Sequence, residues 1–139
     1  MDKIIKIGLI GIAVLFFSCD KNEEKNTTLK IGEVTEMKLG ETVENSQKGL
    51  SLRMDKLNDS RCPTGAICCW QGVATVKFHL KTKEGEHDFT LEKFGLEGGR
   101  SSEGVVIEGL KYYIVDVLPY PVVGKEQSVK TVKILVGGK

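Results

Sequence analysis

The sequence has no excess of positive or negative charge, and this balance excludes one broad class of partners. Twenty lysines and arginines stand against 19 aspartates and glutamates, for a formal net charge of +1. Residues 1–18 hold two of the basic and one of the acidic side chains, so the rest of the chain carries 18 of each. A balanced chain exerts no long-range attraction on nucleic acid or on an anionic membrane surface. We therefore expect no nucleic-acid partner.

Groups that support common enzyme chemistries are also scarce. The chain has two histidines, His79 and His87, predicted to face each other as solvated side chains across one hairpin, with no obvious carboxylate or cysteine beside them to complete a metal site. No glycine-rich phosphate loop follows a strand and opens a helix, and no Cys-x-x-Cys is present. No two carboxylates are singled out as a catalytic pair. These absences predict a protein that is not an enzyme and has neither a cofactor nor a metal site.

No apolar run is long enough to span a bilayer as a helix. The apolar stretch 7–17 has eleven residues, follows Lys3 and Lys6, and ends at Ser18-Cys19. This length is typical of the hydrophobic region of an export signal. The Ser18-Cys19 junction resembles a bacterial lipobox, although Phe16 stands where leucine is usual. The resemblance implies that signal peptidase II cuts before Cys19 and that its thiol carries lipid.

Residues 20–28 are polar or charged without exception, which predicts a disordered tether. Their acidic side chains resemble the surface-export signals of Bacteroidetes lipoproteins. We therefore expect a signal peptide over 1–18, lipidated Cys19 and a tether over 19–28, and one domain over 29–139. The membrane partner would be reached through the lipid anchor, and the expected location is the cell envelope, at the outer membrane, on its periplasmic face or at the cell surface.

Three prolines, 16 glycines and a period-two alternation of apolar side chains indicate a β protein. No stretch carries an apolar stripe of helical period over three turns. Pro119 and Pro121 should end a central strand or lie at an edge. The predicted strands cover 29–39, 50–55, 74–81, 86–91, 104–108, 112–118 and 131–136. About seven short strands predict an all-β fold, either an antiparallel β-sandwich (Ig-like) or a small barrel.

Three cysteines remain after Cys19, which is an odd number. Cys62, Cys68 and Cys69 all lie in the segment 59–74. An exported location is oxidising, so a disulfide is expected for a close pair. Cys62 can reach either Cys68 or Cys69, and closing the first loop would add roughly 2–2.5 kcal/mol of stability. A bond between the adjacent Cys68 and Cys69 would be strained. One thiol is left over.

The other residues of this segment each allow a structural and a functional interpretation. We expect Cys69 to be buried as a small apolar side chain, with a reactive thiol, an intermolecular bond or a metal ligand as alternatives. Arg61 is expected to pair with Asp59 and fix the loop, or else to contact a ligand. Trp70 is expected to pack on the disulfide, whereas an exposed ring would indicate a glycan or peptide platform. Gly72 predicts a bulge or a close backbone approach.

The pattern D-S-R-C-P-x-G-x-x-C-x-W-x-G-x-A over residues 59–74 resembles a segment of uncharacterised bacterial exported proteins and lipoproteins. The resemblance implies that Cys62 and Cys68 form the disulfide and that Cys69 falls at a variable position and is the free thiol. It agrees with an exported, β-rich domain and implies no activity.

Taken together, the sequence predicts a membrane-anchored lipoprotein with a non-enzymatic β-sandwich that binds a protein or a glycan or has a structural role. The contacts are expected from the loops around 62–70 and 94–102, with Arg61 and Trp70 as candidate contact residues. The alternative is a thiol- or metal-dependent envelope protein that uses Cys69 together with a histidine. A protease inhibitor is a third option, resting only on a small loop stiffened by a disulfide.

Overall fold

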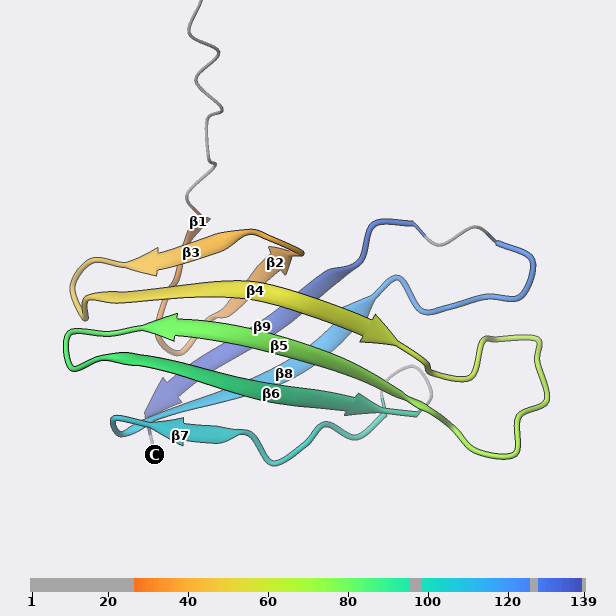
Figure 1. The fold of residues 1–139 in the computed structure, drawn as a ribbon. Helices are drawn as coiled ribbons and strands as arrows, with labels where there is room; N and C mark the ends of the chain where they lie inside the picture. The colour runs from red at the N-terminus through yellow and green to blue at the C-terminus, as the bar shows by residue number, and fades with distance from the viewer. Residues whose placement is uncertain (1–26, 96–98, 126–127, 139) are drawn as a thin grey trace, which may run out of the picture.

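The computed structural model describes residues 27–95, 99–125 and 128–138 as two packed β-sheets (Figure 1). In the described part of the chain the secondary structure is strand, without a helix, so no helix there could span a membrane. The predictions for Cys19, for the signal peptide and for most of the tether fall outside the described residues. The strands are β1 (Thr27–Thr28), β2 (Val34–Lys38), β3 (Thr42–Asn45), β4 (Leu50–Asp59), β5 (Val73–Lys81), β6 (Glu86–Phe94), β7 (Val105–Ile107), β8 (Leu110–Leu118) and β9 (Thr131–Gly138).

One sheet has the order β1-β3-β4-β5-β6 and the other the order β2-β9-β8-β7. Apart from the short parallel pair β1–β3, neighbouring strands run antiparallel. The sheets are separate and not closed into a barrel, so the sandwich alternative of the predicted fold is confirmed. β8 lies inside its sheet and ends before Pro119, as the sequence predicts.

The core lies between the two sheets and follows the period-two pattern. In β5 every second side chain from Ala74 to Leu80 is buried, and the side chains between them face outward. Phe89 of β6 connects the sheets, because its ring centroid lies 5.4 Å from that of Phe78 on β5 and 5.4 Å from that of Tyr112 on β8. Burial raises the pKa of Tyr112 to about 12, with a smaller contribution from Glu108.

The structure differs from the predicted strands in the N-terminal third. The predicted strand 29–39 shortens to Val34–Lys38, and β3, which buries only Val43, is not among the predicted strands. Thr27 and Thr28, which the sequence places in the tether, pair with β3 as the strand β1. The folded domain therefore begins two residues before the predicted boundary at residue 29.

Two β-bulges interrupt the long strands. The register shifts between Met54 and Lys56 in β4, and again between Ile114 and Asp116 in β8. An extra residue in one strand bends it and turns additional side chains toward one face. In β4 the bulge makes two consecutive residues, Asp55 and Lys56, face solvent on the outside of the five-stranded sheet.

Candidate functional site

Two long connections extend beyond the strands at one end of the sandwich (Figure 1). One joins β4 to β5 over residues 60–72, and the other joins β8 to β9 over residues 119–130. They are paired, because the Thr64 N–H donates to Pro121 O at 2.9 Å and the Val123 N–H donates to Thr64 O at 3.1 Å. This end of the molecule is therefore built from two loops that support each other.

A buried ion pair lies beneath these loops. The Arg61 and Asp59 side chains are 1% and 4% exposed. Arg61 Nε and Nη2 each donate to one oxygen of the Asp59 carboxylate at 2.8 Å, the bidentate geometry that makes such pairs strong and specific. Arg61 Nη2 also donates to Val117 O at 2.9 Å, and Lys130 Nζ lies 3.1 Å from Asp59 Oδ2. The pair thus connects β4 to both ends of the β8–β9 connection.

Tyr120 extends this arrangement to the disulfide loop and to β6. The Arg61 guanidinium carbon lies 4.6 Å from the centroid of the Tyr120 ring. The Tyr120 hydroxyl lies 2.9 Å from both Cys62 O and Gly95 O, which share its proton. We call Asp59, Arg61, Tyr120 and Lys130 the brace.

The charges of the brace favour the ionised carboxylate. Burial by itself would raise the pKa of Asp59, but the hydrogen bonds and charges of Arg61 and Lys130 outweigh it and lower that pKa below its usual value of 3.8. Within the described residues, every buried side-chain nitrogen and oxygen has a hydrogen-bond partner. The brace is therefore a satisfied network that stabilises one position of the loops.

Gly72 closes the base of the disulfide loop. The Ser60 N–H donates to Val73 O at 2.9 Å and the Cys62 N–H donates to Gln71 O at 2.9 Å. At Gly72 φ is +72°, and an added Cβ would lie 2.1 Å from Ser60 O. The predicted close backbone approach is present, and only glycine fits it.

The structure contains the disulfide Cys62–Cys68, the pairing that the resemblance implies, with the two Cα atoms 6.0 Å apart. The prediction that Cys69 is buried in the core is wrong, because Cys69 is exposed. Trp70 is 63% exposed, which matches the alternative of an exposed ring and not that of a ring packed away from solvent. Since the loop lies beyond the ends of the sheets, its second half has no core to pack against.

Arg61 does not fit the predicted role of a ligand contact, because its side chain is buried and committed to Asp59. The structural interpretation, an ion pair that fixes the loop, describes it instead. Ile67 was not singled out from the sequence, yet it is fully exposed, and Val122 and Val123 on the paired connection are 37% and 55% exposed. We call Ile67, Trp70, Val122 and Val123 the apolar tip.

The second predicted contact loop, around 94–102, is described only in part, since residues 96–98 lie outside the described ranges. Its base is closed by the Phe94 N–H, which donates to Arg100 O at 2.7 Å. Buried Lys93 donates to Gly99 O across the same turn. These contacts hold the base of the loop beside the brace residue Tyr120, which bonds Gly95 O.

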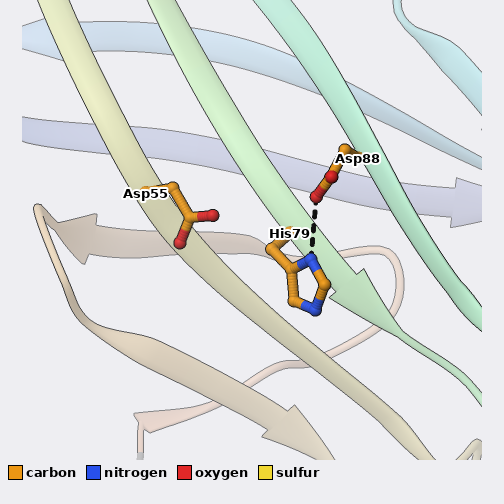
Figure 2. A group of neighbouring side chains, drawn as sticks. All are labelled: Asp55, His79 and Asp88. Atoms are coloured by element: carbon orange, nitrogen blue, oxygen red, sulfur yellow. Dashed lines mark hydrogen bonds and ion pairs between the residues drawn. The ribbon is translucent and has the colours of Figure 1, made fainter.

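The two histidines lie on opposite faces of the β5–β6 hairpin, which corrects the prediction that they face each other. His79 is directly opposite Asp88, whereas His87 is opposite Leu80. His79 Nδ1 lies 2.7 Å from Asp88 Oδ1, with Asp55 on its other side (Figure 2). His79 therefore has carboxylate neighbours that were not predicted from the sequence.

His87 Nε2 lies 3.1 Å from Glu108 Oε1 on the turn between β7 and β8. Neither histidine lies near Cys69. The stretch of β5 from Val73 to His79 alone spans roughly 20 Å, and His87 lies beyond it, at the turn end of the hairpin. The thiol and the imidazoles are not brought together.

No protein-family model matches the chain, and neither a curated protein nor a solved structure matches it.

Proposed function

We propose that the chain is an envelope lipoprotein, anchored through lipid on Cys19, whose β-sandwich binds a protein partner through the apolar tip. It is not an enzyme in this proposal. The observation that carries it is the exposure of Trp70 and Ile67 on a loop whose base is held by a disulfide and by a buried ion pair.

Rigidity distinguishes the tip from an ordinary surface loop. A loop that is already ordered loses little conformational entropy when a partner binds, so more of the contact energy contributes to affinity. Here the disulfide fixes Cys62 and Cys68, and Tyr120 bonds Cys62 O. Tryptophan is also among the residues most often found to dominate binding energy at protein interfaces.

The chemistry of the tip favours a protein over a glycan. A sugar platform needs hydrogen-bonding side chains around the ring, because a sugar presents hydroxyl groups along its edges. Beside Trp70, this end exposes the aliphatic side chains of Ile67, Val122 and Val123, and the exposed polar side chains of the disulfide loop are those of Thr64 and Gln71. An apolar surface of this kind is complementary to apolar side chains of a second protein.

The proposed anchor and the tip are compatible in space. Thr27, the first described residue, lies toward the other end of the sandwich from the two loops (Figure 1). A domain tethered to a membrane through its N-terminus would therefore present the tip away from the attachment point. We place the protein at the outer membrane, on its periplasmic face or at the cell surface.

Site-specific crosslinking tests this proposal. A photoreactive amino acid replaces Ile67 in the full-length protein in cells, and the matched control replaces Leu39, which is 58% exposed in the β2–β3 turn. We expect a defined protein adduct from position 67 and none from position 39. The captured partner is then purified, and its affinity should fall at least about 30-fold with Trp70→Ser, a typical hot-spot loss.

Three results would contradict the proposal. One is equal adduct yield from both positions, and a second is a captured partner whose affinity does not depend on Trp70. A third is binding of purified glycans by the tip with no protein adduct. The thiol alternative makes a separate prediction, because Cys69→Ser should abolish function if the thiol acts and should leave partner binding unchanged if the tip acts.

A further inference from the structure

The outer face of the five-stranded sheet carries three side chains of metal-binding type at one level. Asp55 on β4, His79 on β5 and Asp88 on β6 come from three neighbouring strands (Figure 2). One ligand atom of each lies within 4.8 Å of the other two. We propose that these three side chains bind a divalent transition-metal ion of the zinc type, with the remaining coordination positions open to water.

The sheet itself brings the ligands together. His79 and Asp88 are direct cross-strand partners, so their side chains share a face at the shortest spacing that a sheet offers. The bulge between Met54 and Lys56 supplies Asp55 as an extra outward residue that has no cross-strand partner of its own. Strands are a rigid support, and ligands on them hold their geometry better than ligands on loops.

The distances suit a metal ion with little movement. His79 Nδ1 and Asp88 Oδ1 are 2.7 Å apart, whereas nitrogen and oxygen ligands of tetrahedral zinc are about 3.3 Å apart. An ion would replace the proton between them and spread them by less than about 1 Å. The Asp88 side chain is 60% exposed, so no packing opposes that shift.

A carboxylate, Glu86, lies near the other nitrogen of the His79 ring. If Nδ1 of His79 binds the ion, Nε2 carries the proton and lies 3.7 Å from Glu86 Oε2. A carboxylate that accepts a hydrogen bond from this nitrogen fixes the tautomer and increases the basicity of the ligand, and Glu86 has to approach by several tenths of an ångström to make that bond. Imidazole with carboxylates suits a transition metal better than calcium, which takes oxygen ligands.

Arg53 is the competitor for this site. Its Nε lies 2.5 Å from Asp55 Oδ1, and that hydrogen bond, with the charge of Arg53, lowers the pKa of Asp55. The hydrogen bond occupies one carboxylate oxygen and leaves the second for the ion, but the guanidinium charge opposes a cation beside it. Affinity should rise when this charge is removed.

Calorimetric titration of Zn²⁺ into the detergent-purified full chain tests the site. Cys69→Ser is used as the background, so that the free thiol cannot bind zinc. We expect one ion per chain. His79→Ala should weaken binding at least about tenfold, whereas the matched control His87→Ala should leave it unchanged. Arg53→Gln should tighten it.

The outcomes are decisive because these side chains lie on the surface, and circular dichroism can verify that each variant is folded. The proposal is overturned if the background protein binds no zinc, or if His79→Ala binds as tightly as His87→Ala. Unchanged or weaker binding in Arg53→Gln would overturn the assignment of Asp55 as a ligand. None of these substitutions changes a residue of the apolar tip, so the outcome of the zinc titration does not decide the proposed function, which the crosslinking experiment tests.

Discussion

Removing the Arg61 side chain tests the brace most sharply. Arg61→Ala deletes two hydrogen bonds to Asp59, one to Val117 O and the contact with the Tyr120 ring. It leaves a carboxylate that is 4% exposed without its bidentate partner. Breaking a buried ion pair by removing one member costs about 3–5 kcal/mol. Lys130 remains 3.1 Å from Asp59 and compensates in part, so we expect a loss of about 3 kcal/mol.

Urea unfolding followed by far-ultraviolet circular dichroism measures this loss as a difference in the free energy of unfolding. In a thermal melt the same change should lower Tm by roughly 12 °C, at about 4 °C per kcal/mol for a domain of about 110 residues. The matched control is Arg53→Ala, which deletes an arginine from the exposed pair with Asp55, where Arg53 is 51% exposed. An exposed pair contributes little to stability, because water and salt screen its charges. If Arg61→Ala costs no more than Arg53→Ala, the brace does not stabilise the domain.

Three further predictions concern the same end of the molecule. Because the pKa of Asp59 lies below 3.8, its stabilising contribution is present above that pH and is lost as the pH falls through the folded-state pKa. The difference in unfolding free energy between wild type and Asp59→Asn should therefore shrink in urea melts as the pH is lowered from 7 toward 3, and a constant difference would exclude the ionised carboxylate as its source. Gly72→Ala should lower Tm far more than Gly40→Ala, because both glycines have positive φ but only at Gly72 would a Cβ meet backbone atoms; equal losses in the two melts would contradict the close approach. Reducing the Cys62–Cys68 bond should lower the unfolding free energy by about 2 kcal/mol on the chain-entropy estimate, checked by urea melts with and without reductant, and an unchanged value would mean that the brace alone holds the loop.

The fold class could be predicted from the sequence because strands with one buried face have a visible period of two. Ala74 to Leu80 illustrates this, since the buried and outward positions alternate without exception. The choice between sandwich and barrel could not be made, because it depends on which strands pair across long separations. β3 was missed because a four-residue strand with one buried side chain, Val43, carries too little pattern.

The candidate site was predicted only in part, for physical reasons that differ from residue to residue. The Asp59–Arg61 pair is local and visible in sequence, but Val117 O, which accepts from Arg61, is 56 residues away. Exposure of Trp70 depends on how far the loop extends beyond the sheets, and sequence does not encode this directly. His79 was matched with His87 instead of Asp88, an error of one residue in hairpin register that moves a side chain to the other face.

The native thiol at the tip offers the most direct measurement of the central proposal. Cys69 is free, exposed and next to Trp70, so its rate of alkylation by a maleimide reports whether the tip is covered. The rate is compared between intact envelopes and the purified protein, with Leu39→Cys in a Cys69→Ser background as the control position. We expect labelling of Cys69 to be at least about tenfold slower in envelopes and to be restored by Trp70→Ser, with no such difference at residue 39. Equal rates for Cys69 in envelopes and in solution would contradict a partner on the apolar tip.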